Sequence, residues 1–241
     1  MIGTVYGLIG LLSLWQILVI TLDLPFFILP TPFRVAEVFL LSFDLIAKHT
    51  LVTLTEVVVG LIIGAVLGIL TAILLAASSM AQIFLRPMLI FSQALPVFAL
   101  APILTLWFGY GLWSKVAMAV LIIYFPVTSA FFDGLMRTPK GFLDLAYTMG
   151  GTSLNTMLKI RIPAALPSLA SGFKLAAVYA PIGATIGEWV GSSEGLGYLM
   201  LLANGRVKTD LMFAAMLTLG IVSVALYLTV DFLTKRMINY E

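Results

Sequence analysis

The chain has 241 residues, of which 61% are hydrophobic and only 10% are charged, and its formal net charge is +2. A water-soluble domain carries about 25% charged residues, so this composition excludes an ordinary soluble protein and predicts a membrane protein. The chain has no cysteine, which excludes a disulfide framework, a zinc site built on cysteine and a thiol nucleophile. The small net charge does not indicate nucleic acid as a partner.

Six apolar segments are long enough to cross a bilayer, for which about 20 residues are needed. They predict an all-α protein with one membrane domain over residues 1–241, and they cover residues 2–22, 51–77, 83–108, 112–133, 166–190 and 211–234. The first segment lacks a basic n-region and a small-residue cleavage site. It therefore indicates a retained membrane helix and not a signal peptide.

Prolines shape two parts of this pattern. The third segment has three prolines within residues 87–102, which predict a helix that is packed in the bundle, lines a cavity or is simply bent. After the first segment, Thr31 is expected to cap a helix that has Pro32 in its first turn. Residues 33–48 mix apolar and charged positions, which predicts one amphipathic helix on the membrane surface or against the side of the bundle.

The distribution of lysine and arginine predicts that both termini lie in the cytoplasm. In that orientation seven basic residues lie inside and five outside. The inside set is Arg86, Arg137, Lys140, Lys159, Arg161, Lys235 and Arg236, and the outside set is Arg34, Lys48, Lys115, Arg206 and Lys208.

Residues 135–165 form a polar, basic loop after the fourth segment, and its glycines and prolines predict two short helices. Thr138 and Pro139 indicate a helix start, because threonine supplies a capping oxygen and proline lacks an N–H that the first turn leaves unbonded. Gly150 and Gly151 are expected to end this helix, since glycine adopts the left-handed conformation at low cost.

Thr152 is expected to cap a second short helix over residues 153–161, which Pro163 stops. Both helices carry apolar side chains, and such short helices are marginal in isolation. We therefore expect the loop to dock on a surface of another protein.

The spacing within this loop resembles the cytoplasmic signature of bacterial ABC importer permeases. That signature reads Glu-Ala-Ala, three residues, Gly, nine residues, Ile, one residue and Leu-Pro. The corresponding residues here are Asp144, Leu145, Ala146, Gly150, Ile160, Ile162 and Pro163. Every spacing agrees, while Asp144, Leu145 and Ile162 replace the usual Glu, Ala and Leu.

Other segments resemble one branch of these permeases, which moves sulfonates, taurine, nitrate and thiamine-precursor pyrimidines. They are "LPTPFRVAEVF", "LPVFALAPILTLWFGYGLWSKV" and "IGEWVGSSEGLGYLM". Within the branch, "VYAPIGATIGEWVGSSEGLGYLM" and "RVKTDLMFAAM" are most similar to permeases for hydroxymethylpyrimidine. The resemblance implies import of such a pyrimidine by alternating access, and a sulfonate, taurine or nitrate is the alternative.

The resemblance also implies the partners of the chain. It implies a multi-pass subunit of the bacterial inner membrane that pairs with a second permease copy as a homodimer. Two ATP-binding subunits in the cytoplasm would hold ATP and Mg, and a substrate-binding protein would dock outside. The chain itself would then be no enzyme and would have no cofactor or metal.

The resemblance assigns the loop to a cleft on the ATP-hydrolysing subunit. Asp144 then pairs with a basic residue of that subunit, or it is a solvated acid on a helix face. Gly150 is a required corner between the two helices, or an ordinary helix stop.

Polar residues in the apolar segments are candidates for the translocation path, because ionisable groups there are costly and usually functional. Lys174 could face the path, pair with a neighbouring helix or extend to the interface. Glu188 could contact the binding protein, close an outer gate or be a wetted helix end. Ser92, Gln93 and Tyr179 are further path candidates.

The small residues of the fifth segment and the lone histidine allow two interpretations each. The glycines and alanines between residues 170 and 187 could line the path, or they could simply allow neighbouring helices to approach closely. His49 is expected to be a cap or an interface residue and not a metal ligand.

The sequence offers little support for two other classes of protein. A secondary transporter usually has internal repeats and acids within its membrane helices, and this chain has no clear repeat. A membrane enzyme needs a cluster of catalytic polar groups, and one histidine without cysteine leaves few candidates. No GxxxxGKS or GxxxxGKT motif occurs, so the chain has no ATP site of that type.

Overall fold

The computed structural model describes residues 2–238, and over this range it contains helices and no β-strand, which confirms the all-α prediction. The helices are α1 Ile2–Thr21, α2 Pro32–Leu41, α3 Phe43–Ala77, α4 Ser79–Ala94, α5 Val97–Phe108, α6 Leu112–Met136, α7 Lys140–Thr148, α8 Ser153–Thr156, α9 Ile162–Gly191, α10 Leu196–Gly205 and α11 Thr209–Ile238. A π-helical turn, η1 Met157–Arg161, joins α8 to α9.

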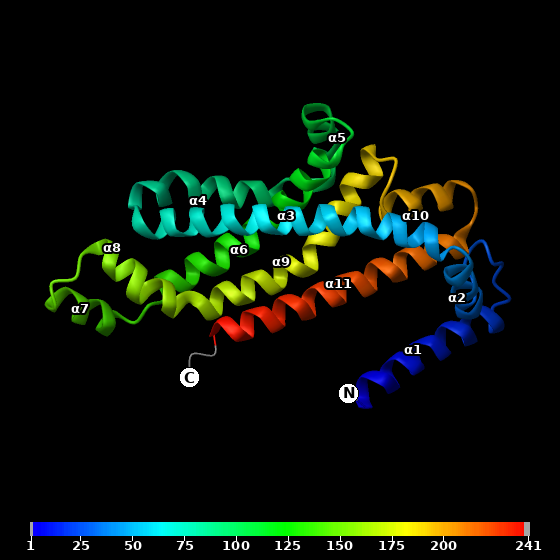
Figure 1. Ribbon diagram of the computed structural model, residues 1–241, viewed down its shortest axis with the longest axis horizontal. Coiled ribbons are helices and arrows are strands. Elements are labelled where there is room, and N and C mark those ends of the chain that lie inside the picture. The colour runs from blue at the N-terminus through cyan, green and yellow to red at the C-terminus, as the bar shows by residue number, and fades with distance from the viewer. Residues whose placement is uncertain (1, 239–241) are drawn as a thin grey trace.

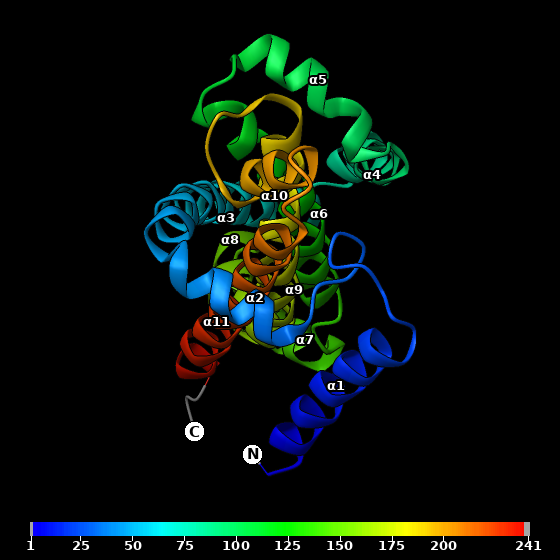
Figure 2. The ribbon, with the colours of Figure 1, turned by 90° about the vertical axis from the view of Figure 1, so that its right-hand side faces the viewer.

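Helices α3, α6, α9 and α11 run side by side along the long axis of the molecule (Figure 1). Short helices lie at the two ends, α2 and α10 at one and α7 and α8 at the other, while α1 and α5 lie at the periphery (Figures 1 and 2). In the described part of the chain, four helices are long and apolar enough to cross a membrane, or five if the bent pair α4 and α5 is one span. The sixth crossing, by α1, remains a prediction.

The core forms where α6 packs between α3 and α9, and glycine allows this packing. A Cβ atom on Gly60 would lie 2.6 Å from Cβ of Ala119, and Gly64 and Gly68 meet α6 in the same way one and two turns further on. On α9, a Cβ atom on Gly183 would lie 2.7 Å from Cα of Ala119. The small residues of the fifth segment therefore allow close helix packing, which is one of the two interpretations of this segment.

The third predicted span, 83–108, is not one helix. Helices α4 and α5 meet at an angle of 102°, at a break formed by Leu95 and Pro96. Proline disfavours the helical conformation of the residue before it, and Leu95 is extended, with φ −77° and ψ 127°. Pro87 and Pro102 lie inside their helices without ending them.

The predicted amphipathic helix over residues 33–48 is also divided. Helix α2 ends at Leu41, Ser42 leaves the helical conformation, and α3 begins at Phe43. Thr31 caps α2 as expected, because its hydroxyl oxygen accepts a hydrogen bond from the amide of Arg34 at 3.3 Å. The charged residues after position 42 thus belong to the first turns of the long helix α3.

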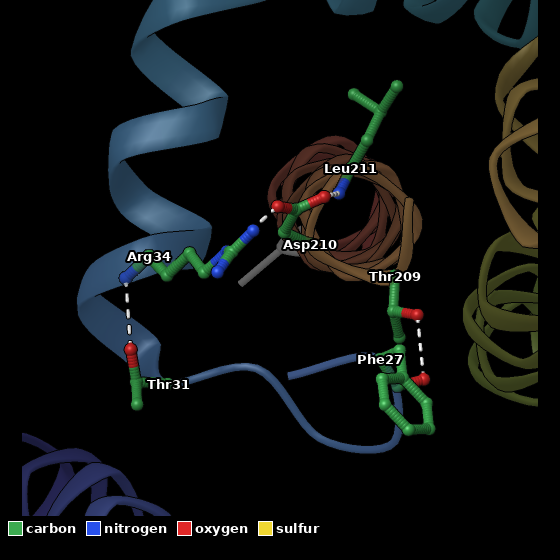
Figure 3. Close-up of polar contacts among 6 residues, drawn as sticks. All are labelled: Phe27, Thr31, Arg34, Thr209, Asp210 and Leu211. Carbon is green, nitrogen blue, oxygen red and sulfur yellow. Dashed lines mark hydrogen bonds and ion pairs between the residues drawn. The ribbon is translucent and has the colours of Figure 1, made fainter. Parts of the chain in front are cut away.

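Polar contacts attach the start of α2 to the start of α11, as Figure 3 shows. Nε of Arg34 donates to a carboxylate oxygen of Asp210 at 3.0 Å, and the Thr209 hydroxyl donates to the carbonyl oxygen of Phe27 at 2.9 Å. The guanidinium group of Arg34 also lies 4.3 Å from the centre of the Phe26 ring. Of the two placements left open for this helix, the structure has the one against the bundle.

The sequence predicted that Pro163 stops the second loop helix, and this prediction is wrong. The chain continues from α8 through η1 into α9, so that residues from Ser153 to Gly191 form one helical run of 39 residues. Pro163 falls in the first turn of α9, directly after the π-helical turn η1, and the first turn is where a helix tolerates the missing N–H of proline.

The helix ends make the predicted topology testable in this cysteine-free chain. Thr152 lies before α8 and Asn204 lies in α10, at opposite ends of the bundle (Figure 1). We expect Thr152→Cys to react with a membrane-impermeant maleimide only in inside-out vesicles, and Asn204→Cys only in right-side-out cells. Reaction of both cysteines from the same side would contradict the topology, and the unmodified chain is the blank because it has no thiol.

Candidate functional site

The two loop helices meet at a tight glycine corner. Helix α7 ends at Thr148, and Gly150 has a φ of +74°, in the left-handed region that the sequence predicted. The Gly150 amide donates to the carbonyl oxygen of Tyr147 at 3.0 Å, and the Gly151 amide donates to that of Ala146 at 2.8 Å. These two bonds close the end of α7, since glycine bears no Cβ that would clash in this conformation.

Capping differs between the two helices. The Thr152 hydroxyl oxygen accepts a hydrogen bond from the Asn155 amide at 3.3 Å, which confirms the predicted cap of α8. Thr138 does not cap α7, because its hydroxyl donates back to the carbonyl oxygen of Leu135 at 3.1 Å and Pro139 occupies the cap position. The hydroxyl is thus used to end α6 and not to begin α7.

The tip of this segment presents apolar side chains to the outside. Tyr147 is 84% exposed and Met149 78%, while Asp144 and Leu145 beside them are also exposed. Ala146 is buried against the segment, and Ile160 and Ile162 are half-buried where η1 joins α9. Of the residues with the signature spacing, Asp144, Leu145 and Gly150 are therefore exposed, and Ala146 is buried beside them.

The base of this segment rests on the end of the bundle. Met157 is buried in the main hydrophobic core, and a hollow of about 480 Å³ lies between Ile73 and Ala76 of α3 and Leu143 of α7. Helices α8 and α9 and the π-helical turn η1 form one helical run, which connects the glycine corner directly to the bundle.

A second feature is a cleft along one face of α6, with a volume of about 600 Å³. Helix α9 and the junction of α4 and α5 form its other walls. It is lined by Gln93, Val97, Ile122, Phe125, Pro126, Ser129, Ala130, Asp133, Leu175, Tyr179 and Ile182. Of the predicted path residues, Gln93 and Tyr179 lie in this cleft, and Ser92, Lys174 and Glu188 are not part of its lining.

Lys174 pairs with a neighbouring helix. Its ammonium group lies 2.5 Å from one carboxylate oxygen of Asp231 in α11, and Lys235 lies 2.7 Å from the other. Of the roles open to Lys174, the structure therefore has the pairing within the bundle. Ser92 donates its hydroxyl to the carbonyl oxygen of Leu89, one turn back in its own helix.

Glu188 belongs to a buried polar cluster near the α2 and α10 end of the bundle. Its side chain is 1% exposed, so the interpretation as a wetted helix end is wrong. The Thr53 hydroxyl donates to one carboxylate oxygen at 2.6 Å, and the Gly197 amide donates to the other. Thr53 in turn accepts a bond from the Leu196 amide at 2.8 Å, so this cluster holds the start of α10 against α3.

His49 extends the same cluster. Its Nδ1 accepts a hydrogen bond from the Gly195 amide at 2.9 Å, which confirms the expectation of an interface residue. Gly195 has a φ of +106°, and a Cβ atom there would overlap the Glu188 carboxylate. The segment between α9 and α10 can therefore pass this close only because glycine occupies the position.

Sequence reasoning missed two buried charged residues in this part of the bundle. Lys115 was placed in an outside segment, but it is 1% exposed, and its ammonium group donates to the carbonyl oxygens of Tyr110, Gly111 and Gly191. Glu56 is 2% exposed beside Glu188, and its Oε2 has no hydrogen-bond partner within the described residues. A charged residue inside a long apolar helix was the signal that could have pointed to both.

Comparison with known proteins identifies the family of this bundle. Residues 60–238 match the family described as "Binding-protein-dependent transport system inner membrane component". The chain belongs to this family. It is thus a permease subunit of an ABC importer, and the matched range contains the glycine corner, the cleft and the helical run into α9.

Individual relatives agree with this assignment. The chain is 51% identical, over 95% of its length and 93% of the relative, to a probable ABC transporter permease protein of Haemophilus influenzae. It is 39% identical, over 78% of its length and 75% of the relative, to the formylaminopyrimidine transport permease protein ThiX of Halalkalibacterium halodurans. The fold is similar to that of the inward-facing MetNI methionine ABC transporter, with a TM-score of 0.71 at 18% identity, covering 81% of this chain and 97% of that chain.

Proposed function

We propose that this permease forms a single membrane domain in the bacterial inner membrane and imports an aminopyrimidine of the thiamine-precursor type. ATP hydrolysis on a separate subunit drives the import by alternating access. The observation that carries this proposal is the exposed helix, glycine corner and helix that continues into α9. A short rigid element of this kind transmits a closing movement of its partner, whereas a flexible loop would absorb it.

The partner at this tip is an ATP-binding subunit, present in two copies with its ATP and Mg. An apolar rim of Tyr147 and Met149 around the acidic Asp144 suits a partner cleft with an apolar floor and one basic residue. The tip and both termini then face the cytoplasm.

The other partners cover different parts of the bundle. A second copy of the permease packs against the peripheral helix α5, where Leu106 is 82% and Trp107 72% exposed. A substrate-binding protein docks at the opposite end, over α2 and α10. This arrangement leaves the remaining exposed apolar side chains to the lipid.

Similarity to the formylaminopyrimidine permease, whose name states its cargo, supports this substrate class. The alternative cargo of the branch is a sulfonate, taurine or nitrate. Import of a pyrimidine requires no chemical change and therefore no catalytic residue or cofactor in this chain.

Asp144 provides a direct test of the docking. We expect Asp144→Lys to reduce both copurification of the ATP-binding subunit and ATP-driven uptake of hydroxymethylpyrimidine by about tenfold or more, because like charges then meet in a docked interface. Asp144→Glu should retain both activities, and Asp144→Ala should be intermediate, because the apolar contacts remain. Uptake is measured in vesicles that contain both subunits, with the binding protein added.

A charge reversal on the partner separates pairing from local effects. A basic-to-acidic change in the cleft of the ATP-binding subunit should partly restore the Asp144→Lys complex, which a change in helix propensity cannot explain. If no ATP-binding subunit copurifies with the unmodified chain, the proposed function is wrong. Equal behaviour of the Lys, Ala and Glu variants at equal expression would show that Asp144 is only a solvated acid.

A further inference from the structure

The cleft along α6 has an unusual distribution of polar groups. Of the eleven residues that line it, seven are apolar, and Gln93, Ser129, Asp133 and Tyr179 are polar. Asp133 is the one charged member of this lining, and the residue is exposed. In the described part of the chain, no lysine or arginine lines the cleft.

The charge of Asp133 is not balanced by an ion pair. Within residues 2–238 the ion pairs join Arg34 to Asp210, Lys48 to Glu194, and Asp231 to both Lys174 and Lys235. Arg86 lies over the Phe132 ring, with its guanidinium carbon 5.9 Å from the ring centre, and lines a different groove with Pro87 and Ile90. The carboxylate of Asp133 therefore faces the cleft as an acceptor.

The position of this carboxylate sets the order in which a solute would meet the lining groups. The lining of α6 runs from Ile122 to Asp133, about 16 Å along the helix, so a single small ring fills only part of the cleft at a time. Phe125 and Tyr179 offer flat apolar walls, and Gln93 offers an amide that both donates and accepts. A planar ring passes these groups and then meets Asp133 near the α7 end of α6.

An anion and an N–H donor experience this end of the cleft in opposite ways. A sulfonate or nitrate is repelled by a carboxylate that no ion pair balances. An amino group or a protonated ring nitrogen donates to the same carboxylate in a charge-assisted hydrogen bond, which is about twice as strong as a neutral one. The sign of the charge thus separates the two substrate classes that the family resemblance leaves open.

We propose that this cleft is the binding site of the substrate within the membrane, and that Asp133 selects a planar nitrogen heterocycle with N–H donors and rejects anions. The proposal rests on the proposed function, since it names the substrate site of that permease. Gln93 and Tyr179 contact the ring while it lies at one end of the cleft, and Asp133 accepts hydrogen bonds from its N–H groups after it has moved to the other end.

Protection of an introduced cysteine tests the site directly in this cysteine-free chain. Ser129→Cys places a thiol in the cleft, and Ser171→Cys on α9 is the matched control, because Ser171 is exposed but does not line the cleft. Each full-length variant, in membrane vesicles, is alkylated with N-ethylmaleimide in the presence of 4-amino-5-hydroxymethyl-2-methylpyrimidine or of ethanesulfonate.

We expect the aminopyrimidine to slow alkylation of Ser129→Cys but not of Ser171→Cys, and ethanesulfonate to slow neither. Adding Asp133→Asn should raise the half-protecting aminopyrimidine concentration about tenfold, because a charge-assisted bond is replaced by a neutral one. Protection by ethanesulfonate alone, or by neither solute, would overturn the proposed site. Equal protection with and without Asp133→Asn would overturn the role of Asp133.

These outcomes are distinct from a failure of the proposed function. Copurification of an ATP-binding subunit and ATP-driven uptake test the permease role, and neither is measured in the alkylation experiment. ATP-driven uptake of ethanesulfonate but not of the aminopyrimidine would retain the permease role and reject the substrate class assigned here.

Discussion

Replacing Gly150 by valine should reduce ATP-driven uptake about tenfold or more, while insertion into the membrane stays normal. Gly150 has a φ of +74°, and nothing lies within 4 Å of the position of a Cβ atom, so the cost arises from the backbone conformation and not from a clash. A β-branched residue in the left-handed region costs about 1–3 kcal/mol. The chain can avoid this strain only by changing the backbone conformation at residue 150, which changes the angle between α7 and α8. ATP hydrolysis should then continue without transport.

Two variants control this prediction. Gly150→Asn should retain most uptake, since asparagine tolerates the left-handed conformation better than other residues with a side chain. Gly141→Val changes a glycine of α7 that has no atom within 4 Å of its Cβ position and no positive φ, so it should have a small effect. Normal uptake by a fully expressed Gly150→Val protein would refute the proposal that the rigid corner transmits the movement of the partner. Equal losses in all three variants would indicate general damage to the loop.

Replacing Glu188 by alanine should destabilise the α10 end of the bundle by about 2–4 kcal/mol, because the Thr53 hydroxyl and the Gly197 amide lose a buried acceptor. The segment between α9 and α10 should then open. Thermal unfolding in detergent measures the loss, and faster trypsin cleavage at Arg206 or Lys208 than in the unmodified chain reports the opening.

The neighbouring residue Glu194 provides the control. Its carboxylate is exposed and accepts a hydrogen bond from Lys48 at 2.9 Å, and this bond holds the pKa of the Glu194 carboxyl below its ordinary value. The stability that this ion pair contributes is fully present above the ordinary carboxyl pKa, and it is lost as the pH falls through the lowered pKa of Glu194. Because the pair is exposed, Glu194→Gln should change the free energy of unfolding little. Equal effects of Glu188→Ala and Glu194→Gln would contradict the structural role of the buried cluster.

Local sequence patterns were sufficient for several parts of this protein. The composition predicted an all-α membrane protein, because apolar helices are the structures that hide their backbone groups from lipid. Thr31 and Thr152 were identified as caps because the capped amide lies three residues further on in the same segment. The left-handed Gly150 followed from a glycine pair between two apolar helices.

Two helix boundaries were predicted wrongly from local sequence patterns. Pro163 was expected to end a helix, yet the turn before it is π-helical and the helix continues, with Met157 of that turn buried in the core. Residues 33–48 were expected to form one helix, but the attachment of α2 to α11 turns the chain at Ser42. In both cases the chain follows its tertiary packing and departs from the local pattern.

The sequence by itself established the class of protein, the positions of its main helices and the spacing of the loop that resembles the family signature, because each depends on residues close together in the chain. The buried cluster joins Thr53 to Glu188 across 135 positions, and the cleft brings Gln93, Asp133 and Tyr179 together from separate helices. No local pattern encodes these contacts, since they arise only when α3, α6 and α9 pack through their glycines. Folding alone therefore buried Lys115 and Glu188 and left Asp133 facing a cleft.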